Sequence, residues 1–186
     1  MHPELLTPRL RLRPFVMDDA ADLARIANDR DIAANTLTIP YPYHESAGRE
    51  WIATHADGVE RHSPVVYAVA RRTDGALIGA TGLALVPEHR RAELGYWIAR
   101  AAWGQGFATE ASAALLEYGF ERLGLERIHA AHFPRNPASG RVLQKLGMRH
   151  EGTLRSHLVK WDVPEDLAVY GILREEFTPW RARSEG

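Results

Sequence analysis

A glycine-rich turn that runs directly into an amphipathic segment constrains the fold of this chain more than any other feature. Residues 103–111 read Trp-Gly-Gln-Gly-Phe-Ala-Thr-Glu-Ala. Glycine lets the backbone bend sharply and lets a ligand approach closely, while the first turn of a helix leaves N–H groups unpaired at the positive end of its dipole. The sequence therefore predicts a phosphate-binding turn at the start of a helix.

Two common phosphate-binding motifs do not fit this turn. A P-loop requires Gly-Lys-Ser/Thr at the start of the helix, where this chain has Gly-Phe-Ala-Thr. A dinucleotide fingerprint requires a third small residue where Thr109 stands, and an opening βαβ unit, whereas this turn lies past the middle of the chain. A plain strand-to-helix connection remains the alternative, since such turns often contain glycine.

The segments on both sides of the turn point to one family. A strand candidate, Ala-Glu-Leu-Gly-Tyr-Trp-Ile, precedes it at 92–98, and a second strand candidate at 127–133 is followed by an Asn-Pro-Ala-Ser turn and a helical pattern over 136–148. Together they resemble the GNAT superfamily of acyl-CoA-dependent N-acetyltransferases, in particular the branch of bacterial ribosomal-protein N-terminal acetyltransferases. In that family a Gln/Arg-x-x-Gly-x-Gly/Ala turn binds the coenzyme A pyrophosphate. Gly106 and Ala108 match the pattern, and Trp103 replaces its first residue.

Length and composition agree with one compact enzyme domain. The 186 residues contain no Pro/Gly/Ser-rich linker, so we predict a single N-acetyltransferase domain over 1–186, with a core over about 7–178 and a short flexible C-terminal tail. The formal net charge of −1, with interspersed signs, argues against a nucleic-acid partner. We find neither a signal peptide nor an apolar run of membrane-spanning length, and therefore expect a cytoplasmic monomer or homodimer without a membrane partner.

The residue types available limit the chemistry. The chain has no cysteine, which excludes disulfides, thiolate metal sites and a cysteine nucleophile. Its nine histidines show no metal-binding spacing, because His129 and His132 would point to opposite faces of a strand. We therefore expect no metal, and the resemblance to the GNAT superfamily implies acetyl-CoA as the co-substrate.

The pattern of elements predicts an α+β fold. Antiparallel strands are expected in the first half and a parallel βαβ crossover around the glycine turn, in a mixed, mostly antiparallel sheet of about seven strands with about four helices. The last two strands are expected to pair across a turn at 163–165, and Asp18 is a candidate N-cap for the first helix. The predicted strands are 10–13, 65–71, 77–85, 90–98, 127–133, 148–160 and 166–177, and the predicted helices start near 19 and span 45–59, 106–123 and 137–146.

The resemblance implies a coenzyme site. The family inserts the pantetheine arm between the two parallel strands where they separate, so Trp97 and Ile98 would offer main-chain partners to the arm. The acidic Glu110 complements the helix dipole, and we expect it to be structural. The diphosphate would be held by the main-chain groups of Gly104, Gln105, Gly106, Phe107, Ala108 and Thr109.

The next helix start carries two further candidates. Asn136 and Pro137 suit the N-cap and N1 positions. By the resemblance, Asn136 and Ser139 would lie against acetyl-CoA, with the Ser139 hydroxyl donating to the departing thiolate; a solvated turn serine is the alternative. Arg141 and Lys145, four residues apart, would reach a coenzyme phosphate or form a solvated basic face.

Glu93 is the candidate base, acting directly or through a water, and a structural carboxylate is its alternative reading. It shares a strand face with Gly95 and Trp97. An α-amine with a pKa near 8 is roughly a tenth neutral at pH 7, so a modest base suffices for direct transfer from acetyl-CoA in a ternary complex.

The acceptor is the least determined part of the site. Tyr41, Tyr43 and Trp51 lie in and after a proline-rich loop that, in this family, forms part of the acceptor cleft; core packing is the alternative. The hypotheses are acetylation of a protein N-terminal α-amine, acetylation of a small amine such as a polyamine, an amino acid or an aminoglycoside-like compound, and acyl-CoA binding without catalysis. Trp161 stands where this branch often has glycine.

Overall fold

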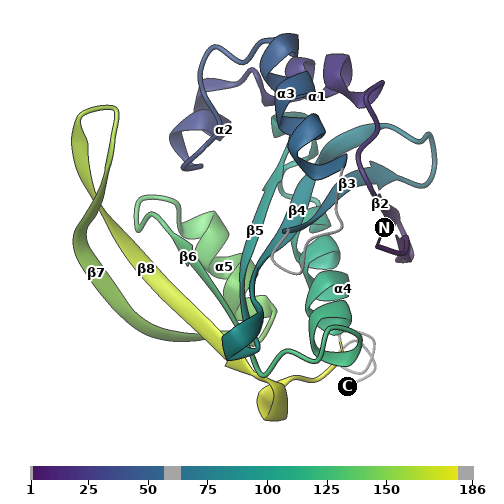
Figure 1. The fold of residues 1–186 in the computed structure, drawn as a ribbon. Coiled ribbons are helices and arrows are strands. Elements are labelled where there is room, and N and C mark those ends of the chain that lie inside the picture. Colours follow the sequence, from purple (N-terminus) through teal and green to yellow (C-terminus); the bar gives the residue numbers. More distant parts are fainter. Residues whose placement is uncertain (1, 57–63, 180–186) are drawn as a thin grey trace.

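The fold is a single mixed sheet with helices on both faces (Figure 1). The computed structural model describes residues 2–56 and 64–179. Within them, the sheet has eight strands in the order β1-β2-β3-β4-β5-β6-β8-β7. The strands are β1 (Leu5–Leu6), β2 (Leu10–Arg13), β3 (Val65–Arg71), β4 (Leu77–Val86), β5 (Arg91–Ile98), β6 (Arg127–His132), β7 (Arg149–Lys160) and β8 (Val163–Leu173). The helices are α1 (Asp19–Ala27), α2 (Arg30–Ala34), α3 (Glu45–Ala56), α4 (Phe107–Glu121) and α5 (Pro137–Lys145).

Two apolar clusters attach the helices to opposite faces of the sheet. Tyr67 and Val69 belong to the larger cluster, which also contains the inner sides of α4 and α5. Ala68, between them in β3, belongs to the smaller cluster with α1 and α3. Because successive side chains of a strand point to opposite faces, α4 and α5 cover one face of the sheet, and α1 and α3 cover the other.

The predicted βαβ crossover is confirmed. β5 and β6 are parallel neighbours, joined through α4, but they pair only from Arg91 with Arg127 to Glu93 with His129. Beyond that point β6 continues beside β8, and β5 continues beside β4 to Ile98. The two parallel strands therefore separate, and within residues 2–56 and 64–179 no strand pairs with that edge of β5 beyond Glu93.

The α+β fold class is confirmed, but the turn predicted at 163–165 is wrong. Trp161 and Asp162 form the turn, with φ of 50° and 63°, and β8 already begins at Val163. Pro164 pairs with Val159 inside the strand. The proline is tolerated because β6 pairs with β8 only from Ala168 onward, so at Pro164 the other edge of β8 has no ladder.

The N-terminal half also differs from the prediction. Asp18 makes no side-chain cap; instead Asp19 accepts hydrogen bonds from Arg13 and from the Val16 N–H. Helix α2 was not predicted, although Asp29 caps it by accepting from the N–H groups of residues 31 and 32. The predicted end of the second helix at residue 59 and most of the C-terminal tail lie outside the described residues. Within 2–56 and 64–179, no helix is long and apolar enough to cross a membrane.

Candidate active site

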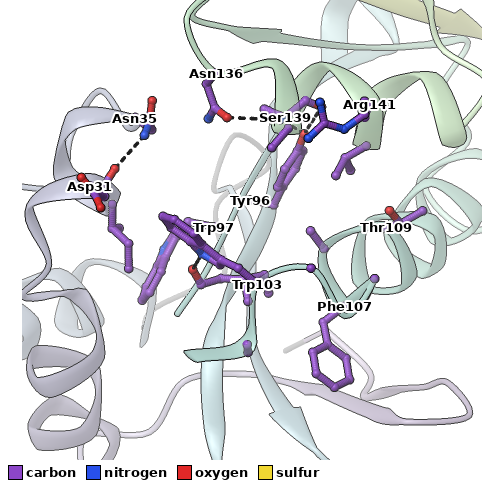
Figure 2. Close-up of a pocket in the computed structure, with 18 of the residues that line it drawn as sticks. Asp31, Asn35, Tyr96, Trp97, Trp103, Phe107, Thr109, Asn136, Ser139 and Arg141 are labelled. Atoms are coloured by element: carbon purple, nitrogen blue, oxygen red, sulfur yellow. Dashed lines mark hydrogen bonds between the residues drawn. The ribbon is translucent and has the colours of Figure 1, made fainter. Parts of the chain in front are cut away.

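A cavity of about 330 Å³ lies where β5 and β6 separate. Figure 2 shows its lining residues, which come from α2, the end of β5, the glycine turn with the start of α4, and α5. The predicted residues among them are Trp97, Ile98, Gly104, Gly106, Phe107, Ala108, Thr109, Asn136, Ser139, Arg141 and Lys145. The lining that was not predicted consists of Asp31, Ile32, Asn35, Thr36, Tyr96, Ala102, Trp103, Ala138 and Val142.

The glycine turn has the geometry that an anion site requires. Gly104 and Gly106 have φ of 75° and 80°, which L side chains rarely adopt. Gly106 is the N-cap of α4, and its carbonyl accepts the first helical hydrogen bond, from the Glu110 N–H at 3.0 Å. The N–H groups of residues 107–109 precede that bond and are the unpaired donors of the helix start. The ring of Phe107 points away from the cavity (Figure 2), so that residue contributes its backbone.

A buried carboxylate supports the turn from behind. Glu110 accepts from the Thr7 hydroxyl at 2.6 Å, the Arg9 N–H at 2.9 Å and Arg9 Nε at 2.6 Å. Arg9 also donates to the Gln105 carbonyl at 2.9 Å. Glu110 thus joins the N-terminal segment to α4, which agrees with the structural role expected for it. Gln105 does not line the cavity, and its side chain donates to the Ala101 carbonyl.

Trp103 occupies part of the predicted path of the coenzyme arm. Its indole Nε1 donates to the Ile98 carbonyl at 2.6 Å, a contact drawn in Figure 2. Ile98 is one of the two residues predicted to pair with the arm through the main chain. A ligand that donates to this carbonyl would therefore share it with the indole, because a carbonyl oxygen has two lone pairs.

Ser139 is held from two sides at the start of α5. Asn136 is the N-cap, and its side chain accepts from the Ser139 N–H at 3.3 Å. The Tyr96 hydroxyl lies 2.8 Å from Ser139 Oγ and 3.1 Å from its carbonyl oxygen. Burial raises the pKa of Tyr96 to about 12, against a smaller opposing effect of the Ser139 hydrogen bond. Tyr96 was not predicted as a site residue. The alternation along β5, which places its side chain on the face opposite Glu93, Gly95 and Trp97, is the sequence signal that could have identified it.

Two basic side chains line the cavity from α5. Arg141 and Lys145 are one helical turn apart and share the lining with Thr109 of α4. Positive charge beside an N-terminal helix end is suited to a phosphate. Their contact with a coenzyme phosphate stays a prediction.

Glu93 does not line this cavity. Its side chain is 54% exposed, and its carboxylate lies 3.9 Å from His129 Nε2, at the last paired position before β5 and β6 separate. Burial lowers the pKa of His129, and the nearby Glu93 carboxylate opposes this shift. The role of Glu93 as a base stays a prediction.

The α2 wall of the cavity is held by two arginines. Arg100 makes a hydrogen-bonded ion pair with Asp31. Arg135 donates to the Ala34 carbonyl at 2.7 Å, to Asn35 Oδ1 at 2.9 Å and to Glu165 at 2.8 Å. These contacts position α2, which sequence reasoning missed, beside the start of α5.

The aromatic residues predicted for the acceptor cleft do not line the cavity. Tyr43 is buried in the cluster of α1 and α3, and Trp51 packs edge-on against Phe15 with ring centroids 5.0 Å apart. Tyr41 is about half exposed. Their role in acceptor binding stays a prediction. Among the described residues, no group of three or more His, Asp or Glu could hold a metal ion.

Comparison with known proteins identifies the relatives of this chain. A family model described as an acetyltransferase (GNAT) domain matches residues 9–149. The uncharacterized N-acetyltransferase YoaA of Bacillus subtilis (strain 168) is 37% identical over 176 residues, which cover 94% of this chain and 98% of YoaA. YdaF of the same organism, a putative ribosomal N-acetyltransferase, is 33% identical over 138 residues, 73% of this chain and 71% of YdaF. The structure of Mycobacterium smegmatis RimJ in complex with CoA-disulfide is similar, with a TM-score of 0.81, 27% identity, and coverage of 94% of this chain and 87% of that one.

Proposed function

Because the chain belongs to the GNAT acetyltransferase family and is an acetyl-CoA-dependent N-acetyltransferase, we propose that it transfers the acetyl group directly to a primary amine in a ternary complex. The preferred acceptor is the α-amino group of a protein N-terminus. The observation that carries the proposal is the single cavity that joins the start of α4 to Ser139 and to the α2 wall. The start of α4, the Ser139 side chain and the α2 wall line one continuous space, which supports the binding of coenzyme and acceptor side by side.

In this proposal the glycine turn and α5 bind the coenzyme. The backbone N–H groups of residues 107–109 hold the diphosphate, and the dipole of α4 contributes roughly 0.3–2 kcal/mol of electrostatic support. Arg141 and Lys145 face the same space and supply positive charge. The free edge of β5 at Trp97 and Ile98 binds the arm beside the Trp103 indole, which donates to the Ile98 carbonyl.

The chemistry needs a hydroxyl donor and a base. The neutral amine attacks the thioester carbonyl, so that an N–C bond forms and the C–S bond breaks with its electron pair on sulfur. Ser139 donates a hydrogen bond to that sulfur. The amine proton passes to Glu93 through water, since the Glu93 side chain is about half exposed and does not line the cavity. The chain has no cysteine for an acyl-enzyme on sulfur, which is consistent with direct transfer.

The protein N-terminus is preferred because of the relatives and the acid–base chemistry. The relative YdaF is named a putative ribosomal N-acetyltransferase. An α-amine is roughly a tenth neutral at pH 7, whereas lysine is neutral in about one molecule per few thousand. An exposed carboxylate acting through water is therefore an adequate base for an α-amine and a poor one for lysine.

A small amine is the second candidate, and one feature of the structure favours it. The hairpin of β7 and β8 is tied across to the α2 region: Arg135 joins α2 to Glu165, and Lys160 Nζ donates to the Leu37 carbonyl at 3.4 Å. An extended polypeptide that passed between the hairpin and the α2 region would have to break these contacts. A small amine would not require them to open.

Thermal unfolding with and without acetyl-CoA tests the coenzyme site first. A ligand at 100 times its dissociation constant adds about 2.7 kcal/mol, which for a domain of this size raises the midpoint by about 5–11 °C. NAD and ATP serve as controls and should have no such effect. Release of free thiol is then measured with a matched panel of N-terminal peptides and small amines. Turnover with peptides supports the first candidate, turnover with small amines alone supports the second, and stabilisation by NAD or ATP instead of acetyl-CoA contradicts the proposal.

A further inference from the structure

The hydroxyl of Tyr96 reaches across the gap between β5 and α5 and meets both polar oxygens of Ser139 (Figure 2). The backbone ladder between β5 and β6 has already ended at Glu93 and His129, so this side-chain bridge spans the separated part of the fold. Tyr96 comes from the face of β5 that packs against the main core. Its ring is therefore fixed, and its hydroxyl is directed at the first turn of α5.

A tyrosine hydroxyl has one hydrogen to donate, so its direction matters. If that hydrogen goes to the Ser139 carbonyl, the Ser139 hydroxyl must give its own hydrogen to Tyr96 to make the 2.8 Å contact. If it goes to Ser139 Oγ, the Ser139 hydrogen is free to point elsewhere. Only the second arrangement allows Ser139 to donate to a sulfur atom in the cavity.

Two observations favour donation from Tyr96 to Ser139 Oγ. The contact with Oγ, at 2.8 Å, has the usual length of an O–H···O bond, and the contact with the carbonyl is longer, at 3.1 Å. The carbonyl of residue 139 lies inside α5, where the N–H of residue 143 is its helical partner, so it does not depend on Tyr96. The Ser139 N–H is already directed to Asn136 Oδ1, which fixes the backbone of the serine.

We propose that Tyr96 is a positioning residue that donates to Ser139 Oγ and thereby directs the Ser139 hydrogen to the departing sulfur of coenzyme A. This inference rests on the proposed function of Ser139. No proton leaves Tyr96: its hydrogen stays on the phenol, the electron pair of the broken C–S bond stays on sulfur, and the Ser139 hydrogen bond stabilises that charge. Polarisation along the chain Tyr96–Ser139–sulfur makes the serine a stronger donor than it would be alone. The pKa of Tyr96, raised to about 12 by burial, keeps the phenol protonated and able to donate at neutral pH.

The pKa of the thiol of bound coenzyme A tests this inference without knowledge of the acceptor. Coenzyme A is bound to the wild type and to Tyr96→Phe, Ser139→Ala and the double variant, and thiolate formation is followed by its ultraviolet absorbance as pH is raised. A free thiol titrates near a pKa of about 8.5. We expect the thiol pKa in the wild type to lie below this value. Tyr96→Phe should raise the thiol pKa by about one unit, which is a tenfold loss of ionisation. Adding Tyr96→Phe to Ser139→Ala should raise it no further than Ser139→Ala alone. Asp31, Arg141 and Lys145 also line the cavity and are unchanged in every variant, so their charges cancel in the comparison.

The kinetic signature separates positioning from a structural role. Phe keeps the ring that packs in the core, so Tyr96→Phe should bind acetyl-CoA within about twofold of the wild type while kcat falls about tenfold. Tyr118→Phe is the matched control: its hydroxyl is hydrogen-bonded to His2 Nδ1 at 3.2 Å, and it does not line the cavity. It should change neither quantity.

The outcomes are distinguishable from failure of the proposed function. A wild type that does not bind coenzyme A contradicts the proposed function itself. Normal binding with the same thiol pKa in the wild type and Tyr96→Phe overturns the inference. So does a double variant in which the two effects simply add, because Tyr96 would then act independently of Ser139.

Discussion

Replacement of Glu110 by alanine should destabilise the protein strongly without removing any group that lines the cavity. The Glu110 carboxylate is buried and accepts from the Thr7 hydroxyl, the Arg9 N–H and Arg9 Nε. Thr7 is also buried, so in the variant its hydroxyl keeps only the longer contact with the Leu10 carbonyl, at 3.3 Å, and the Arg9 backbone N–H loses its acceptor. Hydrogen bonds to a charged group contribute about 1.5–3 kcal/mol each. The Arg9 guanidinium is half exposed, so its ion pair is discounted to between about 0 and 1 kcal/mol.

The expected loss is therefore about 3 kcal/mol in the free energy of unfolding, carried mainly by the Thr7 and backbone contacts. For a domain of this size, that loss lowers the melting midpoint by about 6–12 °C. The assay is thermal unfolding followed by circular dichroism at neutral pH. Glu117→Ala is the control, since Glu117 is in the same helix and its side chain makes no hydrogen bond or ion pair within residues 2–56 and 64–179. A midpoint for Glu110→Ala within about 2 °C of that control would refute the reasoning, because the carboxylate would then contribute no more than a surface charge.

Three further predictions concern the site and its support. Gly106→Asp should abolish acetyl-CoA binding in calorimetry, because it places a side chain at a φ of 80° and a carboxylate at the predicted phosphate position. Gly124→Asp is the control: Gly124 has a φ of 69° and lies beyond the other end of α4, so this variant should be similarly strained but bind acetyl-CoA normally. Ser139→Ala should lower kcat about 10–100-fold while leaving the acetyl-CoA dissociation constant unchanged, and an unchanged kcat would assign the serine to helix structure alone. Asp19→Asn should lower the melting midpoint at about pH 7, since it weakens the two 2.7 Å bonds from Arg13. Burial raises the pKa of Asp19, but the bonds from Arg13 and the Val16 N–H outweigh it and hold the pKa below its ordinary value. The stabilisation by ionised Asp19 is therefore fully present above the ordinary aspartate pKa of about 3.9 and is lost as pH falls through the lower pKa of the folded state. The melting midpoints of the wild type and the variant should therefore converge in acid. A difference between the midpoints that stays constant with pH would contradict this assignment.

The agreement between sequence and structure is best where the determining contacts are local. The glycine turn and α4 follow from residues within one or two helical turns of each other, and the Asn136 cap joins residues three apart. The parallel neighbours β5 and β6 follow from the strand–helix–strand order, because a right-handed crossover of this length leaves few alternatives. The wrong turn at 163–165 also reflects the use of local signals. Proline is a strong local signal for a turn, whereas the Trp161-Asp162 pair that forms the turn is not.

The sequence by itself determined the fold class, the glycine turn at the start of α4 and the Asn136 cap of α5, because periodicity, glycine and capping residues act over a few positions. Only the tertiary structure decided which side chains meet in the cavity. Tyr96 contacts Ser139 across 43 residues, and Arg135 holds α2 through the Ala34 carbonyl across 101. The tertiary structure also places Glu93, and the aromatic residues predicted for the acceptor cleft, outside the lining of the cavity that contains Ser139. These contacts, and the position of Glu93 outside the cavity, depend on where β5 and β6 separate and on how α2 packs against the start of α5. Such packing sums many weak, non-local contacts, for which a single sequence carries no local signal.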